Sequence, residues 1–540
     1  MHELDLGRLE ESVAKRISKL QYGDAMVRIK SFVEQVINDP ESVAAVFASR
    51  ELDALCSRLA SVYYGHRREP GSEGRGTVIL ASELVRAGGH VELIKDYLAL
   101  GLFESPVRVA LSDLFNRMDR STIEEWESLL GCEVFIAEDA GLDGKLDALD
   151  AQISEWNPST ILTLAHNQDV VCVVAAHFPG ATRRYYIHHG DHHLSLGVTC
   201  EAFEHVDLHN MSYELCKHEI GVQHQHYWPL TAVRPSRIKT EFLERGALTT
   251  ASCGRMSKFE AGTYAFCYER AVALMLKATR GYHVHIGELT ADFMQKIHAE
   301  LDAENVSHDR FIHVEWVPSL CQALIEHAVD VYVASFPIGG GKALIEALSI
   351  GLPVVTHASY RSRYHSSFDL TYPESFVWSG YEELVEIFGR WNEALVKEQA
   401  ALALQYFERY YSKEAFLKAF ADGRNADADV PPLHLYHGNR LQTYLDIRRM
   451  REQVLGPLES ENKRILTEWA NLHAAYEEHS ATILRQQLDI ERLSNEKNTL
   501  AMKLLEQQAA FQQARDEELA RSWKSKAKKL LYVMHANKKS

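Results

Sequence analysis

Residues 329–357 decide the fold, and they read VDVYVASFPIGGGKALIEALSIGLPVVTH. A strand of the buried type is followed by a turn with three glycines, a helical stretch and a second short apolar strand. Strand, helix and strand in this order predict a βαβ unit of a parallel sheet. Glycines at a strand-to-helix turn let the backbone approach a phosphate, and the free N–H groups of the helix N-terminus attract an anion. The segment therefore predicts a diphosphate site at Gly339, Gly340 and Gly341.

Two charged residues follow the glycine turn. Lys342 adds a cation to the first turn of the predicted helix, and Glu346 comes four residues later, about one helical turn further on. A carboxylate at that place can accept hydrogen bonds from a ribose diol. An ordinary helix entry and a solvated Glu are the alternative interpretations. Taken together, turn, cation and carboxylate predict a bound nucleotide.

The same alternation of short β-branched runs and helical periods continues on both sides of this segment. A first series runs from TVILASEL (77–84) through VRVAL, CEVFIAE, TILTLA and RRYYIHH to HVDLH (205–209). A second series runs from LTTASC (248–253) through GYHVHIGEL and FIHVEWVP to GLPVVTH. The expected fold class is therefore α/β, with two Rossmann-like domains in tandem over residues 71–240 and 241–422.

The remaining parts of the chain are expected to be helical or to connect domains. Residues 1–70 are predicted to be a helical segment, because Leu6, Leu9, Val13, Ile17 and Leu20 recur at helical spacing. Residues 423–455, rich in Asp, Gly and Pro, are predicted to be a linker.

Residues 456–520 are predicted to form a coiled coil, and residues 521–540 a basic tail. The apolar seam consists of Ile465, Trp469, Leu472, Tyr476, Ile483, Ile490, Leu493, Leu500, Leu504 and Phe511. Polar residues interrupt it at His479, Gln486, Lys497 and Gln507. A seam of this kind predicts a homo-oligomer or a partner protein. The tail has two interpretations, a solvated end or a peripheral contact with an anionic membrane.

Charge and cysteine usage exclude several classes of function. Lys and Arg number 58 against 75 Asp and Glu, and a net charge of -17 disfavours nucleic acid as a partner. Eight cysteines without a Cys-x-x-Cys pair indicate buried thiols rather than a disulfide framework or a zinc ribbon. The sequence has no signal-peptide pattern and no apolar run near the roughly 20 residues that a membrane span needs. The expected location is the cytoplasm, with the inner membrane face as the place of any peripheral contact.

Four segments together resemble the GT-B glycosyltransferases. In that family a strand, a glycine turn, a helix with a ribose-binding Glu and a Gly-x-Pro-Val turn hold the donor nucleotide, as residues 329–357 would. CGRMSKFE (253–260) resembles the Gly-Arg-x-x-x-Lys segment that opens the C-terminal domain, and FIHVEWVP (311–318) the strand next to the base. SELVRAGGHVELIKDYL (82–98) resembles the Gly-Gly turn after the first strand. The match covers about residues 77–420.

The resemblance implies a nucleotide-sugar donor on the C-terminal domain and an acceptor on the N-terminal domain. By this resemblance the donor-binding residues are Arg255, Lys258, Gly339, Gly340, Gly341, Lys342 and Glu346. It also places Gly88, Gly89 and His90 at the floor of the cleft. Many members carry a second Glu eight residues before the ribose-binding one, and here that position is Ile338. Retention and inversion at the sugar therefore both stay open.

A second chemical candidate is YYIHHGDHHLSLG (185–197), at the expected end of an N-domain strand. Inverting transfer needs a base near the acceptor hydroxyl, and His189, Asp191 and His192 are the candidates for it. A retaining enzyme would use the same groups to bind the acceptor or the departing phosphate. A metal site and a polar structural loop are the alternatives. The preferred interpretation has no metal and no cofactor, because the nucleotide sugar is a substrate.

The resulting hypothesis is a hexosyl-type glycosyltransferase that acts on a glycan, lipid-linked or protein acceptor in bacterial surface polysaccharide or glycoconjugate synthesis. Two rivals stay open. One is a sugar-nucleotide epimerase, which consumes donor without an acceptor. The other is a catalytically silent GT-B scaffold that assembles partners through its coiled coil, since a fold does not determine a function.

Overall fold

The computed structural model describes residues 5–39, 42–65, 73–85, 89–139, 141–232, 237–262, 264–436, 438, 440–450, 452 and 456–536. The chain divides into two compact units, Met1–Ile447 and Arg448–Ser540. Each unit is described by itself. Among the helices described in these ranges, none combines the length and the apolar character that crossing a membrane requires.

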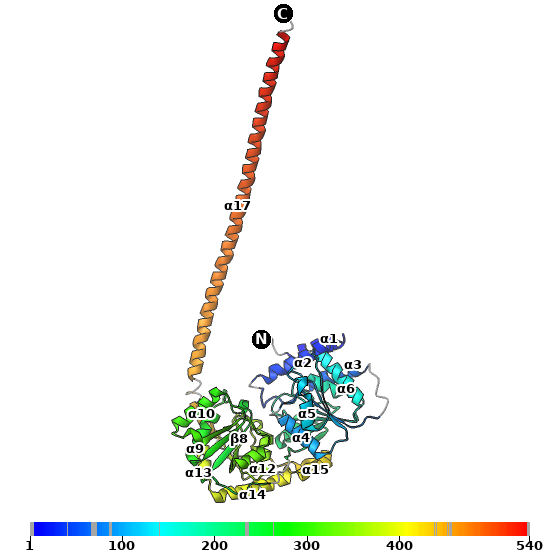
Figure 1. Cartoon of the computed structure of the whole chain (residues 1–540), viewed down its shortest axis with the longest axis vertical. Helices are drawn as coiled ribbons and strands as arrows, with labels where there is room; N and C mark the ends of the chain where they lie inside the picture. The colour runs from blue at the N-terminus through cyan, green and yellow to red at the C-terminus, as the bar shows by residue number, and fades with distance from the viewer. Residues whose placement is uncertain are drawn as a thin grey trace. The chain divides into compact units, whose positions relative to one another are not determined.

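The first sheet has seven strands, all parallel, and it lies in the N-terminal half of the first unit (Figure 1). In sheet order these are β3 (Val134–Ile136), β2 (Val107–Leu111), β1 (Thr77–Ala81), β4 (Thr160–Leu164), β5 (Arg183–His188), β6 (Glu204–Asp207) and β7 (Gln225–Tyr227). The strand order reverses at β1. In open α/β sheets, ligands bind beyond the carboxyl ends of the strands at such a switch point.

Both faces of this sheet are covered, as the apolar strand sequences require. Ile79 and Ala81 of β1 pack in one hydrophobic cluster with α4 (Gly89–Leu100) and α5 (Ile123–Leu130). Val78 and Leu80 pack on the opposite face with α6 (Leu142–Trp156) and α7 (Val170–Ala175). The alternation of side chains along the strand therefore separates two cores.

The N-terminal helical segment is confirmed and adds a further layer over α6 and α7. Its helices are α1 (Leu6–Ile17), α2 (Tyr22–Ile37) and α3 (Arg50–Tyr64). Leu9, Val13 and Ile17 are buried, as their spacing predicts. Leu20 is an exception, because the helix ends before it and its φ of 57° turns the side chain to solvent.

The second sheet has six strands, also parallel throughout. In sheet order they are β10 (Phe311–Val314), β9 (Tyr282–Ile286), β8 (Thr249–Cys253), β11 (Val331–Val333), β12 (Val354–His357) and β13 (Phe376–Trp378). Its helices are α9 (Tyr268–Thr279), α10 (Ala291–Ala303), α11 (Leu320–Glu326), α12 (Gly341–Ser349) and α13 (Tyr381–Gly389). The tandem pair of Rossmann-like domains, the arrangement of the GT-B fold, is thus confirmed.

The chain returns to the N-terminal domain after the second sheet. Helix α14 (Glu393–Tyr410) leads to α15 (Lys413–Asp422), where Phe416 lies 5.9 Å from the ring of Tyr97 in α4. The 3-10 segment η7 (Gly423–Asp429) then packs on β7, and Arg424 Nε donates to Glu204 Oε2 at 2.9 Å. The expectation of a linker from residue 423 is therefore wrong for this segment, whose Asp and Arg residues pair with the N-terminal domain. Helix α16 (Arg440–Met450) follows.

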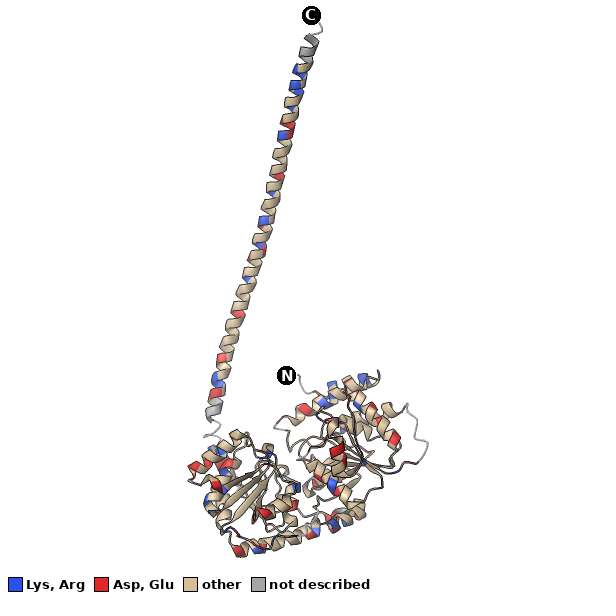
Figure 2. Cartoon of the chain, in the orientation of Figure 1, with Lys and Arg blue, Asp and Glu red and all other residues tan. Residues whose placement is uncertain are grey.

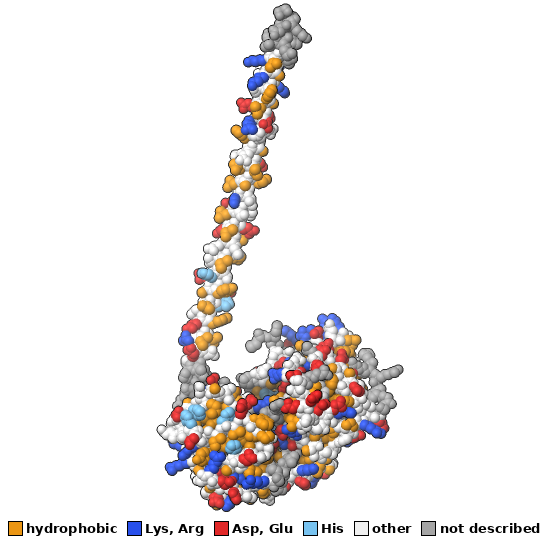
Figure 3. Space-filling view, in the orientation of Figure 1, with side chains coloured by type: hydrophobic (Ala, Val, Ile, Leu, Met, Phe, Trp, Pro, Cys, Tyr) orange, Lys and Arg blue, Asp and Glu red, His pale blue; other side chains and the backbone are white. Residues whose placement is uncertain are grey.

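The second unit is dominated by one helix, α17 (Gly456–Ala536). The ten apolar seam residues predicted for the coiled coil are between 49% and 73% exposed. Apolar side chains therefore lie open along the helix between charged ones (Figure 3). Lys and Arg gather toward its C-terminal end, where Lys524, Lys526, Lys528 and Lys529 are exposed (Figure 2). The predicted tail thus continues α17 as helix up to Ala536, and residues 537–540 lie outside the described ranges.

Candidate active site

The glycine turn connects β11 to α12 and is closely surrounded. Gly340 is the N-cap of α12, and the N–H of Gly339 donates to the carbonyl of His365 at 2.7 Å. A Cβ atom at Gly340 would lie 2.8 Å from Lys258 Nζ, and one at Gly341 would lie 2.8 Å from His209 Nε2. A side chain at either position would displace these groups from the turn. The glycines therefore let two nitrogen-bearing side chains approach the N-terminus of α12.

Lys258 reaches this turn from the segment that resembles the Gly-Arg-x-x-x-Lys motif. It ends the short helix η3 (Met256–Lys258), and its carbonyl accepts from the N–H of Ile338 at 3.3 Å. Burial lowers the pKa of the Lys258 ammonium, and the nearby Arg255 guanidinium lowers it further. Among the residues that the structure describes, no acceptor lies within hydrogen-bond distance of Nζ. A partly buried cation without a counterion, beside a helix N-terminus, is favourable for an anion.

Arg255 lies at the N-cap of η3 with an exposed side chain. Its guanidinium is near enough to His90, on α4 of the other domain, to lower the pKa of that imidazole. Both motif residues, Arg255 and Lys258, thus lie on the side of the C-terminal domain that faces the N-terminal one.

Lys342 is directed away from the glycine turn, in contrast to the expectation that it binds phosphate. Its ammonium forms an ion pair with Asp96 of α4 and donates to the carbonyl of Thr231 at 2.6 Å. The Lys342 and Asp96 side chains are only 13% and 7% exposed. At position 342 of α12 the side chain points toward the N-terminal domain, where its ammonium contacts the Asp96 carboxylate. Lys342 therefore joins the two domains.

Glu346 lies one turn further along α12, where sequence spacing predicts it. Its side chain is 20% exposed, and Lys342 Nζ is 3.9 Å from its Oε1. Burial raises the pKa of this carboxyl to about 7; Lys342 opposes the shift, whereas Glu92 and Asp96 add to it. In the described part of the chain no side chain or backbone group donates a hydrogen bond to it. A hydroxyl-bearing ligand would supply the donors that this carboxylate lacks.

His209 is a residue that sequence reasoning did not single out. It follows β6 as the N-cap of α8 (Asn210–Leu215), and its Nδ1 lies 2.5 Å from Asp191 Oδ2. Burial lowers the pKa of His209, but the Asp191 carboxylate outweighs burial and the net pKa is raised. With Nδ1 bonded to Asp191, its Nε2 is the atom that faces Gly341. The N-terminal domain thereby directs a second nitrogen donor at the glycine turn.

Asp191, one of the predicted acceptor bases, is paired with histidines. Burial would raise the pKa of its carboxyl, but His209 and His192 hold it well below the usual range. His192 Nδ1 lies 3.8 Å from Asp191 Oδ1. An aspartate bonded in this way is a poor proton acceptor. We therefore assign Asp191 to charging and orienting His209 rather than to taking a proton from an acceptor.

A group of three histidines lies at the ends of the N-domain strands. The ring of His90, in the first turn of α4, is 4.0 Å from that of His189 and 5.1 Å from that of His166. Burial, His166 and Arg255 lower the pKa of His90 to about 3. Burial and the two neighbouring imidazoles place the pKa of His189 well below its usual value. His189 Nδ1 is 3.3 Å from the carbonyl of Ile187, so Nδ1–H donates there and Nε2 keeps its lone pair.

The turn before α4 is described only in part. Gly88 lies outside the described residues, and Gly89 is the first residue of α4. A Cβ atom at Gly89 would meet no atom within 4 Å, so nothing described here crowds this position. His90 is the residue of this turn that joins the candidate site.

The structure thus brings most predicted residues to one place and adds others. The carboxyl ends of β4, β5 and β6 supply His166, His189 and His209, and the C-terminal domain supplies Lys258 and Glu346. Ligands in parallel sheets bind at such ends, so the position of His209 after HVDL was a usable signal. The partnership of Lys342 with Asp96 had no such signal, because 246 residues separate them.

Comparison with known proteins gives likenesses in structure only. No protein-family model and no curated protein matches the sequence. The lipopolysaccharide outer core galactosyltransferase WaaB in its apo form is similar over 64% of this chain and 98% of its own, at 15% identity and a TM-score of 0.48. Anabaena HepE in complex with UDP-glucose gives the same coverage and TM-score at 13% identity.

A third likeness comes from another kind of enzyme. A putative UDP-N-acetylglucosamine 2-epimerase from Listeria monocytogenes is similar over 67% of this chain and 99% of its own, at 14% identity and a TM-score of 0.43. These likenesses concern the fold and do not identify a ligand of this chain.

Proposed function

We propose that this protein is a glycosyltransferase that binds a nucleotide sugar at the N-terminus of α12 and transfers the sugar to an acceptor hydroxyl. The observation that carries the proposal is the Lys258 ammonium beside Gly340, which has no partner among the described residues, with the Glu346 carboxyl further along the same helix. A cation and a hydrogen-bond acceptor at this separation match the diphosphate and the ribose of one ligand.

The diphosphate is assigned to the glycine turn. Free N–H groups of α12, the Lys258 ammonium and the His209 imidazole converge there, and Arg255 lies at the edge. An anion would give Lys258 the counterion that the described part of the chain does not provide, and it would raise the lowered pKa of this ammonium. These donors are already held in place by the fold, so they stabilise developing charge without further rearrangement.

The ribose is assigned to Glu346. Two hydroxyl groups of a ribose can donate to one ionised carboxylate, which would bring the pKa of Glu346 down from about 7. A ligand without vicinal hydroxyls would leave the carboxylate partly buried and unsatisfied, at a cost of about 1–3 kcal/mol. Glu346 thus selects for a ribonucleotide.

The transfer step uses groups from both domains. The bond between the anomeric carbon and the diphosphate oxygen breaks, and the nucleoside diphosphate leaves with the bonding electrons. Lys258, His209 and the α12 N-terminus stabilise its added charge. A bond forms between the anomeric carbon and the acceptor oxygen, and the acceptor proton passes to a base. We assign that base to His189, whose Nε2 keeps its lone pair, although burial and the neighbouring imidazoles lower the pKa of this side chain and make it a weak base.

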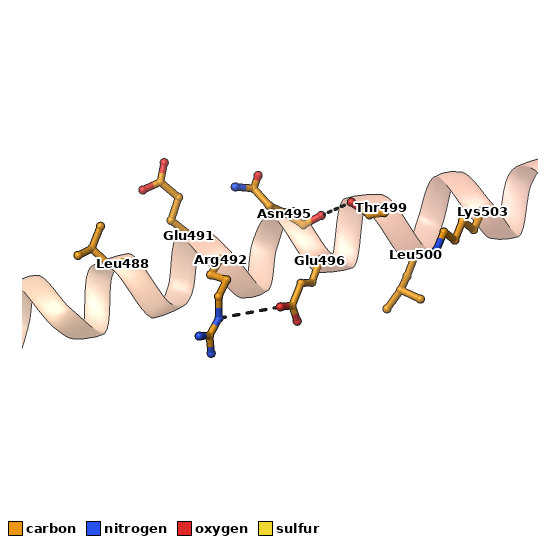
Figure 4. Close-up of a pocket in the computed structure, with 8 residues that line it drawn as sticks. All are labelled: Leu488, Glu491, Arg492, Asn495, Glu496, Thr499, Leu500 and Lys503. Carbon is orange, nitrogen blue, oxygen red and sulfur yellow. Dashed lines mark hydrogen bonds and ion pairs between the residues drawn. The ribbon is translucent and has the colours of Figure 1, made fainter.

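We also propose that α17 pairs with α17 of a second copy of this chain. Its ten seam residues follow a three-four pattern that four polar residues interrupt, and all ten are exposed in the single chain. The hollow in Figure 4 is lined by eight side chains of this one helix, among them Leu488, Leu500 and Lys503. A hollow between side chains of a single helix is no enclosed ligand site, and of its lining only Leu500 belongs to the seam.

The test of the donor site is a thermal-shift panel of nucleoside diphosphates, nucleotide sugars and the matching 2′,3′-dideoxynucleotides. A ligand at 100 times its dissociation constant adds about 2.7 kcal/mol to stability. We expect one ribonucleotide series to stabilise the wild type, with the effect reduced at least tenfold in affinity in Lys258→Met and in Glu346→Ala. Lys296→Met on α10 is the matched control and should bind like the wild type. Equal stabilisation of all four proteins would contradict the assignment.

Product analysis then separates the transferase from its rivals. Donor turnover that requires an acceptor supports a transferase. Donor turnover without an acceptor, with a changed sugar, identifies an epimerase. Nucleotide binding without turnover of any donor favours the scaffold.

A further inference from the structure

Four potential metal ligands meet in the interior of the N-terminal domain. They are His188 at the end of β5, His205 and Asp207 on β6, and Cys216 at the start of the π-helix η2 (Cys216–Ile220). All four are buried, and their ligand atoms all lie within 4.8 Å of one another. No step of the proposed reaction uses them.

The spacing of these atoms is close to that of a tetrahedral metal shell. His188 Nδ1 lies 3.1 Å from Asp207 Oδ1 and 3.5 Å from Cys216 Sγ, and His205 Nε2 lies 3.1 Å from Asp207 Oδ2. Zinc bonds of about 2.0–2.3 Å at tetrahedral angles put neighbouring ligand atoms about 3.3–3.7 Å apart. A central ion would therefore need only small shifts of these side chains.

The hydrogen-bond pattern indicates that protein groups alone do not satisfy the cluster. His205 is 2% exposed, yet within the described ranges neither of its ring nitrogens forms a hydrogen bond, although Nε2 is close to Asp207. The Asp207 oxygen nearest to it accepts instead from Gln225 Nε2 at 2.7 Å. Buried imidazoles without partners are rare, and an unseen ion is one of their ordinary explanations. A cation bound at Nε2 would provide the missing partner.

The local backbone also favours a built site. Single π-helical turns are uncommon and are found frequently at functional sites. Here the widened turn begins at Cys216 and brings its sulfur to His188. Gln225 Nε2 donates to Asp207 Oδ2 and also to the carbonyl of Tyr213 at 2.8 Å. Gln225 therefore fixes the orientation of the Asp207 carboxylate. Such supporting bonds are typical of metal ligands.

We propose that His188, His205, Asp207 and Cys216 bind one zinc ion that has a structural role. Four protein ligands leave no open coordination position, which is the mark of a structural rather than a catalytic zinc. The ion would join β5 to β6 and η2. His189 follows one ligand directly and His209 follows Asp207 by two residues, so the ion would hold both imidazoles in position. Zinc binding itself does not depend on the transferase proposal.

The test measures metal content in the untagged full-length protein, because a histidine tag would bind zinc itself. After gel filtration with a weak chelator, elemental mass spectrometry should find one zinc per chain in the wild type. Cys216→Ser and Asp207→Asn should retain less than a tenth of this amount. Cys56→Ser, at an equally buried thiol of α3, is the matched control and should keep its zinc.

A second measurement on the wild type guards against variants that fail to fold. Replacement of zinc by cobalt should give the strong visible bands of a tetrahedral site and a thiolate-to-cobalt charge-transfer band. Wild-type protein that retains no more zinc than Cys216→Ser would overturn the proposal. A cobalt spectrum without the thiolate band would do so as well, because Cys216 would then not be a ligand of the ion.

Discussion

At the scale of single residues, the Glu346 carboxyl of the candidate site has a raised pKa. Its pKa of about 7 lies above the ordinary 4.5 because burial disfavours the ionised form. A raised pKa means that the folded protein holds its proton where the unfolded chain has already lost it. Stability from this group is therefore complete below about pH 4.5 and is lost as pH rises through 7.

We predict that Glu346→Gln stabilises the ligand-free protein at pH 8 and has little effect at pH 5. The difference between variant and wild type should grow by on the order of 2–3 kcal/mol between these pH values, since each pKa unit corresponds to 1.36 kcal/mol. Melting temperatures in matched buffers measure it. Glu398→Gln, at an exposed carboxyl of α14, is the control and should show no such trend. A constant difference across the pH range would contradict the raised pKa.

The residue scale also shows where sequence reasoning stops. Spacing was sufficient to place Glu346 one turn after the glycines, because helical periodicity is local. It could not assign Asp191, whose role depends on an imidazole 18 residues away. Nor could it show that Lys342 turns to Asp96, since that contact depends on how two domains pack. Side-chain direction across an interface is a tertiary property, and only the folded chain defines it.

At the scale of elements, α12 and α4 are joined across the two domains by the Lys342–Asp96 pair. Burial raises the pKa of Asp96 to about 6, and the Lys342 cation limits this rise. Removing either partner leaves the other largely buried without its countercharge, which costs more than removing both. The pair therefore contributes to the fixed position of the glycine turn relative to α4.

We predict a coupling energy of about 1–3 kcal/mol for this pair at pH 8, which lies above the pKa of about 6 of the Asp96 carboxyl. A double-mutant cycle of Lys342→Met and Asp96→Asn, measured by urea unfolding of the first unit, gives this energy, and any effect on Glu346 cancels to first order. The exposed pair Lys397–Glu393 on α14 is the control, with an expected coupling below about 1 kcal/mol. Additive losses at positions 342 and 96 would show that the two side chains act independently.

Elements were predicted better than their packing. Apolar β-branched runs such as TVILA and TILTL became fully buried central strands, because a sheet covered on both faces needs such runs. The Asp, Gly and Pro content of the segment after residue 422 predicts a linker. Its charged residues instead find partners in the N-terminal domain, such as Asp427, which accepts from Tyr213 at 2.5 Å. An Asp-, Gly- and Pro-rich composition predicts that a segment lacks regular secondary structure. It does not predict whether the segment packs against a neighbouring domain.

At the scale of the whole molecule, the exposed seam of α17 has consequences that extend beyond one chain. A helix of this length, with its apolar side chains in water, gains stability chiefly by packing against another helix. His479 and Lys497 interrupt the seam, and polar residues at such positions restrict register and partner number at some cost in stability. Pairing through α17 would join two copies of the proposed transferase.

We therefore predict that the full-length protein is a dimer and that Leu493→Glu with Leu500→Glu converts it to monomers. The two leucines are 58% and 66% exposed in the single chain and lie on the predicted seam. Burial of a Leu side chain contributes about 1.5–3 kcal/mol, so losing four of them in a dimer should weaken association more than about 100-fold. Sedimentation equilibrium measures the mass of the particle.

Leu488→Glu with Leu505→Glu is the matched control, because these leucines are equally exposed but lie off the seam. Glu is a good helix former, so neither change disturbs α17 itself. A monomeric wild type, or equal loss of association in both double variants, would exclude the seam as the contact between copies.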